Sequence, residues 1–527
     1  MIGIINVDEW ISRLTENESE LMACFKSLYG TNKELLDERK GAFLKTARKF
    51  REVYGAQDVA FVRTPGRLNT LSMHGDHRGS FVNPITFNRE IVICFASRDD
   101  DEVNVHNMNP DYGTQAFSIE SVRPDVAIDT ESAWIDWTQA QTDIRYAAGT
   151  NDYWINKIKA VPVYLMTQLP EKRLKGFDAV LDSTIPTKAG LSSSSAIVVS
   201  TMEIITFIND ITLDDKTFVK YCGVAEWFVG TRGGFGDQAA IKFGRRGMIS
   251  HIKTLPELEL GSYLPFPEGY KIIIFNSCIQ ADKTGKAGQK FNEKTATYEI
   301  GDLYIHKYLR EHHHNLYDSI VDSRKHIDVD KKIHLDDIAR HLSQDDIYRM
   351  LDSIPEYRSR QGLLDDLPEE SEALKKQFAT HDEPDHDYPV RMVIVYGVAE
   401  CKRGDMLEKV LGENRVDMYG RLMTISHNGD RVELDTPRFD PSRELYEQPG
   451  NYGCSIPEID AMVDIALDAG AVGAQIAGAG MGGSMMALVA DDHVNGVIDA
   501  MHERYFVPSG IDDNVVICDS IQGVGIL

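Results

Sequence analysis

Apolar side chains recur at steps of three and four residues along the first 57 residues of the chain. The recurring positions are Trp10, Leu14, Leu21, Met22, Phe25, Leu28, Ala42, Phe43, Ala47 and Phe50. This spacing places them on one face of successive helices. Residues 1–57 are therefore predicted to form an N-terminal helical extension that packs against the rest of the molecule.

Beyond residue 57 the pattern alternates between short apolar runs and longer amphipathic ones. The runs predict strands over residues 59–65, 89–96, 102–106, 177–185, 271–277, 472–477 and 484–490. Helices are predicted over residues 153–165 (interrupted or kinked at Pro162), 197–208, 218–229 and 291–310. An irregular acidic stretch is expected up to about residue 145. A chain of 527 residues exceeds what one hydrophobic core usually supports, so two or more domains are expected.

Composition narrows the class of protein. With 42% apolar and 26% charged residues the chain is typical of a globular protein, and its net charge of −26 argues against a nucleic-acid or anionic-membrane partner. The seven cysteines lack paired CxxC spacing, which indicates free thiols in a reducing compartment and neither disulfides nor zinc. No apolar run spans a bilayer and no signal peptide is evident, so the cytoplasm is expected.

The segment PTKAGLSSSSA, residues 186–196, joins a predicted strand to a predicted helix. Serines at a helix start cap free amides, and those amides together with the helix dipole favour a phosphate. The segment therefore predicts a phosphate-binding loop. The alternative is a serine-capped helix without a ligand, although four consecutive serines exceed what one cap needs.

A second polar segment, GRLNTLSMHGDHRG at residues 66–79, follows the strand predicted over residues 59–65. Packing alone does not call for so many donors and acceptors in one loop, and the group suits a polyhydroxylated ligand. The alternative is a solvated loop, which is favoured for His77 and Arg78 taken singly.

Two acidic residues lie in and just after the predicted helix of residues 218–229. Glu226 lies within that helix, and Asp237 lies near the end of the glycine-rich stretch GTRGGFGDQ at residues 230–238. Phosphoryl transfer needs a metal ion to neutralise phosphate charge and a carboxylate near the attacking hydroxyl, and these two acids are the best candidates. Each could instead be a structural ion-pair partner. Trp154 could stack on a nucleobase or belong to the core.

A third glycine-rich segment, GAGMGG at residues 478–483, also satisfies GxGxxG and raises a different class, a dinucleotide-binding oxidoreductase. That fingerprint requires a strand before the glycines and a helix after them. Residues 484–490 are predicted to form a strand, which disfavours the oxidoreductase.

Together, residues 186–196, 66–79 and 478–483 resemble, in this order, the phosphate loop, the sugar signature and the glycine-rich third motif of the galactokinase-like GHMP kinases. The resemblance covers about residue 58 to the end. It implies an α+β, two-domain fold with the active site in the cleft between the domains. Residues 58–245 would form the N-terminal domain and 246–527 the C-terminal domain, with a helical and acidic insertion around 311–390.

The resemblance also implies a role for each matching residue. Asp237 would act as base or electrostatic anchor, and Arg67 would pair with it; Ser194 and Glu226 would bind Mg²⁺. The ATP-binding residues would be Lys188, Gly190, Leu191, Ser192, Ser193, Ser194, Ser195 and Trp154. The sugar-binding residues would be Met73, His74, Asp76, Gly236 and Phe291.

The chain departs from the galactokinase pattern on the sugar side. Met73 stands where galactokinases have a glutamate that accepts from a sugar hydroxyl, by resemblance the 6-hydroxyl. His77 replaces a tyrosine, and Phe291 stands where a Tyr-Asn pair binds near the sugar. These changes make a galactose relative altered at C6, such as galacturonate, a candidate beside galactose, provided that Arg67, Arg78 or Arg232 lines the pocket.

The resemblance therefore implies an ATP-dependent sugar kinase that phosphorylates the C1 hydroxyl of galactose or of its uronic acid. The alternative is a non-catalytic sensor of sugar and ATP on the same fold, suggested by Met73, Lys188 and Phe291. The expected partners are these small molecules, and the expected assembly is a monomer or small homo-oligomer.

Overall fold

The computed structural model describes residues 3–151, 153–187, 189–230, 234–280, 285–325, 332–436 and 438–527. Its largest sheet has the strand order β1-β2-β4-β7-β5-β6, with β14 added to β2. The strands are β1 (Ile5–Asn6), β2 (Asp58–Asn69), β4 (Pro84–Ser97), β5 (Glu102–Asn107), β6 (Thr114–Ser118), β7 (Phe177–Ser183) and β14 (Gly525–Ile526). Strands β2 and β4 are buried along almost their whole length, because helices cover both faces of the sheet.

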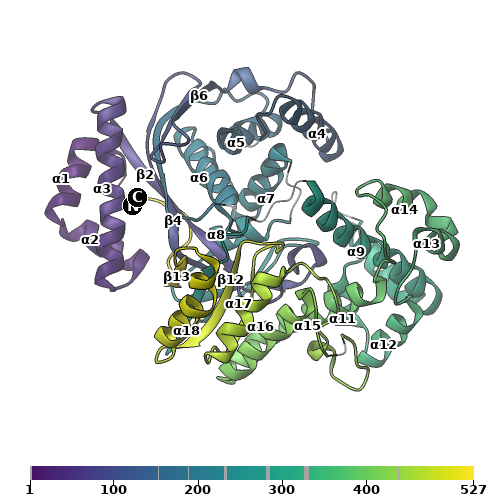
Figure 1. Ribbon diagram of the computed structural model, residues 1–527. Coiled ribbons are helices and arrows are strands. Elements are labelled where there is room, and N and C mark those ends of the chain that lie inside the picture. Colours follow the sequence, from purple (N-terminus) through teal and green to yellow (C-terminus); the bar gives the residue numbers. More distant parts are fainter. Residues whose placement is uncertain are drawn as a thin grey trace.

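The N-terminal residues form the helical layer on one face of this sheet. It consists of α1 (Val7–Glu16), α2 (Ser19–Tyr29) and α3 (Lys33–Tyr54), seen in purple beside β2 and β4 in Figure 1. Their apolar side chains, including Trp10 and Phe43, share one cluster with Phe61 and Val92 of the sheet. The Trp10 indole also donates to Val59 O at 3.2 Å, so the extension is fastened to β2.

Five helices form the other layer: α4 (Glu131–Ala147), α5 (Ile155–Gln168), α6 (Ser193–Ile208), α7 (Asp215–Glu226) and α8 (Gly236–Phe243). Helix α4 lies where an irregular stretch was expected. Helix α5 runs through Pro162 without interruption, contrary to the expectation. Its neighbours Ile158, Val161 and Leu165 are buried in the core. Their burial offsets the cost of the hydrogen bond that a proline cannot donate.

The C-terminal half has its own sheet, ordered β11-β12-β10-β13, beside the small sheet β3-β8-β9. These strands are β3 (Phe81–Val82), β8 (Met248–Lys253), β9 (Glu259–Pro265), β10 (Tyr270–Asn276), β11 (Gly473–Ala477), β12 (Ser484–Ala490) and β13 (Val515–Cys518). Strand β10 pairs with β12 from near the end of the chain. The first sheet and this one organise two parts of the chain, which confirms the predicted α+β, two-domain organisation; the boundary positions stay predictions.

Helices dominate the rest of this half (Figure 1). They are α9 (Gly285–His312), α10 (His314–Ser323), α11 (Leu335–His341), α12 (Gln344–Ser353), α13 (Arg360–Asp366), α14 (Ser371–Phe378), α15 (Val390–Gly412), α16 (Val416–Asp430), α17 (Pro457–Asp468), α18 (Val494–Met501) and α19 (Val507–Ser509). Across the described ranges, no helix is both long and apolar enough to cross a membrane. All seven cysteines are free.

Candidate active site

A cavity of about 1010 Å³ lies where the two halves of the molecule meet. Its walls combine the end of β2, the first turns of α6 and α8, Phe291 of α9 and the turn after β11. The predicted site residues lining it are Arg67, Met73, His74, Asp76, Trp154, Gly190, Leu191, Ser192, Ser193, Ser194, Ser195, Glu226, Gly236, Asp237 and Phe291. Lys188 and Arg232 lie outside the described residues.

The segment of residues 186–195, which we call the phosphate loop, packs tightly against the turn after β11. Gly190 has φ of +80°, and a Cβ added there would lie 2.3 Å from the carbonyl oxygen of Ala477. The glycine is required both by this left-handed backbone and by the close approach. The third glycine-rich segment therefore closes over the phosphate loop.

That third segment joins β11 to β12, two antiparallel neighbours. A strand, and not a helix, follows the glycines, so the dinucleotide-binding fingerprint is not formed. The oxidoreductase alternative is wrong.

Ser192, at the start of α6, forms a hydrogen bond with an acidic side chain and does not cap the helix. Ser192 is the residue before α6, has φ of 62° and makes no side-chain hydrogen bond to the described amides of the first turn. Its hydroxyl donates to Asp237 Oδ2 instead. Contrary to the expectation that serines cap this helix, Ser192 does not cap α6 through its side chain, and the first-turn amides stay available to an anion.

Arg67 and Asp237 form the polar centre of the cavity. Arg67, near the end of β2, donates from Nε to Asp237 Oδ1 at 2.6 Å and from Nη1 to the Gly190 carbonyl at 3.0 Å. Asp237 lies in the first turn of α8, where a helix favours negative charge. One guanidinium thus ties the acid to the phosphate loop.

Glu226, the last residue of α7, lies beside this centre and is buried. Its carboxylate accepts from the Ser195 hydroxyl at 2.9 Å and from Gln238 Nε2 at 2.6 Å. The pKa of Glu226 is raised overall. Burial is the largest cause, hydrogen bonds from Ser194 and Ser195 lower the pKa, and the charge of Asp237 raises it. A buried carboxylate in contact with serine hydroxyls supplies the oxygen ligands that Mg²⁺ prefers, so these residues fit the ion.

Trp154 lies at another wall of the cavity, immediately before α5. Its ring is mostly buried, and the indole donates to Tyr112 O at 3.3 Å. Lys157, one helical turn further along α5, lines the same cavity and was not predicted. The step of three residues from Trp154 was the only sequence signal that could have pointed to it.

The segment of residues 70–79, which we call the sugar loop, brings Met73, His74 and Asp76 to the cavity. Met73 is almost fully buried and belongs to an apolar cluster with Ile273 and Phe275. Gly236 leaves room for Asp76, whose Oδ2 lies 3.0 Å from the position that a Cβ of Gly236 would take.

Asp76 carries a negative charge in this loop. Burial raises the pKa of the Asp76 carboxyl, but the hydrogen bond from His77 and the charges of His77 and His74 outweigh burial and bring it to about 2. An ionised carboxylate accepts hydrogen bonds from hydroxyl groups.

Arg78 contradicts two expectations. It is fully buried, where a solvated loop was favoured, and it is not among the residues that line the cavity. Its guanidinium lies 4.9, 5.1 and 4.6 Å from the ring centroids of Tyr298, Tyr396 and Tyr452. Cation–π attraction holds it there, so Arg78 is excluded as a contact for an acidic sugar.

Comparison with known proteins agrees with this architecture. Residues 156–245 match the family profile "GHMP kinases N terminal domain", residues 407–507 match "GHMP kinases C terminal", and residues 48–97 match the "Galactokinase galactose-binding signature".

Galactokinases are among the chain's relatives along most of its length. Galactokinase of Schizosaccharomyces pombe is 23% identical over 501 residues, which are 89% of this chain and 90% of the relative. Galactokinase of Dictyostelium discoideum is 23% identical over 490 residues, 89% of each chain. The crystal structure of Lactococcus lactis galactokinase complexed with galactose has the same fold, with a TM-score of 0.64 at 21% identity over 91% of this chain and 98% of that one. The chain therefore belongs to the GHMP kinases, as a galactokinase-like sugar kinase that uses ATP and Mg²⁺.

Proposed function

We propose that this kinase transfers the γ-phosphoryl group of ATP to the anomeric C1 hydroxyl of galactose or of its uronic acid, which gives the sugar 1-phosphate. The observation that carries the proposal is the network of Asp237 with Arg67 and Ser192 in a cavity shared by the phosphate loop and the sugar loop.

Asp237 is the residue beside the attacking hydroxyl in this proposal. Its Oδ1 accepts from Arg67 and its Oδ2 from Ser192, so the carboxylate has a fixed orientation. In phosphoryl transfer the protein contributes mainly positioning and electrostatics. Asp237 orients the sugar hydroxyl and takes its proton or stabilises its developing charge. Arg67, also bonded to Gly190, holds this acid at a set position relative to the phosphate loop.

The nucleotide occupies the part of the cavity bounded by the phosphate loop. Residues Gly190 to Ser195 surround its phosphates, and Trp154 lies beside the adenine. Ser194 and Glu226 hold the Mg²⁺ ion, which neutralises phosphate charge during transfer. The position of Glu226 against the serines supports this assignment. Lys188 stays a predicted phosphate contact.

The sugar occupies the part of the cavity lined by Met73, His74, Asp76, Gly236 and Phe291. Asp76 and His74 bind its hydroxyl groups. Met73 offers no carboxylate to accept from a 6-hydroxyl and none to repel a C6 carboxylate. The uronic acid is therefore proposed beside galactose. Arg67 is the described arginine that lines the cavity, and it is paired with Asp237.

A non-catalytic sensor is the less favoured alternative. It requires the changes at Met73, Lys188 or Phe291 to have removed activity. Met73 and Phe291 lie on the sugar side of the cavity, and Lys188 lies outside the described residues. Arg67, Asp237 and Glu226 are assembled around the phosphate loop as a kinase requires.

The test is a turnover assay of the full-length protein with Mg-ATP and separate sugars. Galactose, galacturonate, glucose and glucuronate are compared by ADP release, and the product is identified by phosphorus NMR. The expected result is a 1-phosphate of galactose or galacturonate and little turnover of the glucose-configured pair. Binding of ATP and sugar without ADP release for any of them would establish the sensor instead.

A further inference from the structure

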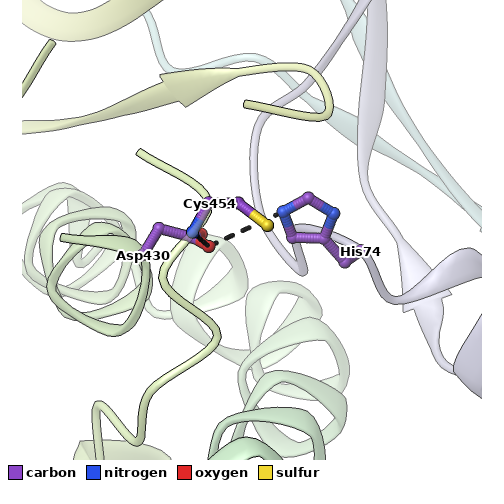
Figure 2. Close-up of side chains that lie close together, drawn as sticks. All are labelled: His74, Asp430 and Cys454. Atoms are coloured by element: carbon purple, nitrogen blue, oxygen red, sulfur yellow. Dashed lines mark hydrogen bonds and ion pairs between the residues drawn. The ribbon is translucent and has the colours of Figure 1, made fainter. Parts of the chain in front are cut away.

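Three side chains of different chemistry meet where the sugar loop touches the C-terminal half (Figure 2). They are His74 of the sugar loop, Asp430 at the end of α16, and Cys454 in the segment before α17. One imidazole nitrogen, one carboxylate oxygen and the sulfur all lie within 4.8 Å of one another. Asp430 and Cys454 do not line the ATP and sugar cavity.

The nitrogen and the oxygen of this set are spaced almost as two ligands of one ion are. His74 Nε2 lies 3.7 Å from Asp430 Oδ1, which is longer than a hydrogen bond of about 2.7–3.2 Å. With metal–ligand bonds of about 2.0–2.3 Å, neighbouring ligands of a tetrahedral zinc ion are roughly 3.3–3.6 Å apart. A shift of a few tenths of an ångström would therefore bring nitrogen and oxygen to ligand positions.

Nearby groups hold the Asp430 carboxylate and the backbone of Cys454. Tyr396 donates from its hydroxyl to Asp430 Oδ2 at 2.8 Å, and Oδ1, the oxygen nearer to His74, also accepts from Cys454 N at 3.4 Å. The carbonyl oxygen of Cys454 accepts from Met481 N at 2.5 Å, which fixes this residue against the turn after β11. Outer hydrogen bonds of this kind hold the ligands of natural metal sites.

Burial and charge also favour an ion. Asp430 and Cys454 are both fully buried, and a cation lowers the cost of a buried carboxylate beyond what its bonds from Tyr396 and Cys454 N provide. Arg78 is the neighbouring cation, but it stacks on tyrosine rings and its nitrogens have no hydrogen-bond partner among the described residues. A divalent ion bound to one carboxylate, one thiolate and a neutral imidazole would give a site without net charge.

We propose that His74, Asp430 and Cys454 bind one divalent transition-metal ion, zinc by preference, which fastens the sugar loop to the C-terminal half. Imidazole and thiolate ligands select zinc over Mg²⁺, so the site differs from the one assigned to the nucleotide. The ligands lie too far apart in sequence for any CxxC spacing, which is why the cysteine pattern predicted no zinc.

The experiment is a cobalt titration of the full-length protein, stripped with a chelator and kept reduced. A thiolate bound to Co²⁺ gives a charge-transfer absorption band that oxygen ligands do not give. The expected result is a band that saturates at one Co²⁺ per chain and disappears when Zn²⁺ is added. Because sugar phosphorylation is not the readout, a failure of the proposed kinase reaction would not affect the result.

Cys454→Ser and Asp430→Asn test the ligands. Each should weaken Co²⁺ binding by at least about a hundredfold, since even outer-shell changes cost tenfold to a hundredfold. Cys401→Ser is the matched control, because Cys401 is equally buried in the same half of the chain and outside the triad. It should keep the band.

Two results would overturn the proposal. One is a wild-type protein without the band, which needs no variant and so does not depend on how the variants fold. The other is a Cys454→Ser protein that folds, as judged by circular dichroism, and still shows the band. Zn²⁺ should also raise the unfolding temperature of the wild type and of Cys401→Ser, but not of Cys454→Ser.

Discussion

The phosphate loop and the sugar loop face one cavity but hold their polar groups differently. Around the phosphate loop, hydroxyl and guanidinium donors meet carboxylates directly, as Ser192 and Arg67 do at Asp237. In the sugar loop, Met73 enters an apolar cluster and Arg78 enters a cage of tyrosine rings. The functional side chains of the first are held by hydrogen bonds and ion pairs. In the second, hydrogen bonds to backbone oxygens hold the loop, and the side chains of Met73 and Arg78 are held by packing.

This difference indicates where the protein can change. Replacing a carboxylate or a hydrogen-bond donor next to the phosphate loop breaks a shared network, since Arg67 donates to both Asp237 and Gly190. Replacing one packed side chain of the sugar loop leaves that network in place. The departures at Met73, His77 and Phe291 are therefore expected to alter which sugar binds and not whether phosphate is transferred.

The largest effect is expected at Asp237. Asp237→Asn removes the charge beside the attacking hydroxyl and should lower kcat by about a hundredfold to ten-thousandfold. The Kd of a non-hydrolysable ATP analogue should change little, because Glu226 and the phosphate loop remain. The measurements are steady-state kinetics and calorimetric titration.

Asp182→Asn is the control, since Asp182 lines the same cavity but pairs with Lys45, 3.4 Å away. This variant should keep near-normal kcat. An equal fall of kcat in both variants would mean that Asp237 has no special role in catalysis. The phosphate loop would then not differ from the sugar loop in its importance for phosphate transfer.

The next largest effect is expected where the phosphate loop meets the turn after β11. In Gly190→Ala the new Cβ would collide with Ala477 O, 2.3 Å away, and φ of +80° adds strain of about 1–3 kcal/mol. The unfolding temperature should fall, and KM for ATP should rise about tenfold or more.

Gly41→Ala is the control for this change. Gly41 lies within α3, and a Cβ added there meets nothing within 4 Å. Alanine should stabilise that helix by about 0.5–1 kcal/mol and leave KM unchanged. A Gly190→Ala protein with normal stability and normal KM would show that the loop does not need this close approach.

Elements with a local signal could be predicted from the sequence. The glycine and serine segments indicated their turns because backbone conformation is a local property, and these turns meet at one cavity. Helix α4 was not recognised because its buried positions are Trp134, Thr138 and Thr142, so only one of the three is apolar. Trp134 is held by a bond to Val224 O, a contact far along the chain.

The sugar side was harder to predict for the same reason. Taken singly, Arg78 was expected in a solvated loop, yet its partners are Tyr298, Tyr396 and Tyr452, far away in sequence. The proximity of His74 to Asp430 likewise depends on how the two halves pack. Packing between distant segments cannot be predicted from the spacing of residues within one segment.

A smaller effect, on specificity, is expected at Met73. Met73→Glu restores a carboxylate that can accept from a 6-hydroxyl and that repels a C6 carboxylate. The ratio of kcat/KM for galactose to that for galacturonate should rise by about tenfold to a hundredfold, the range of one such contact. Competition between the two sugars measures this ratio directly.

Met73→Gln is the matched control, because glutamine has a similar shape without the charge. It should move the ratio less than glutamate does. An unchanged ratio in both variants would show that residue 73 does not contact the C6 group of the sugar. Residue 73 would then not determine which sugar binds.

The smallest effect is expected at His251 on β8, which supports the start of the sugar loop. Its ring stacks on Phe81 at 4.0 Å, and Nδ1 lies 2.7 Å from Asn83 Oδ1. Asn83 N in turn donates to Asn69 Oδ1 at 2.9 Å. Burial lowers the pKa of His251 to about 4; the charge of Glu408 raises this pKa slightly, and the charge of Arg340 lowers it further.

Because the native pKa lies below the unfolded value of about 6.5, the unfolded chain takes up this proton first as the pH falls. Stability from the neutral imidazole is therefore complete above pH 6.5 and is lost as the pH falls toward 4. Between pH 7 and 5.5 the wild type should lose about 1 kcal/mol more stability than His251→Gln, as measured by urea unfolding. His341→Gln, at an exposed position, should behave as the wild type. Equal pH slopes for all three would mean that folding does not lower the pKa of His251, and that its contacts with Phe81 and Asn83 do not depend on a neutral imidazole.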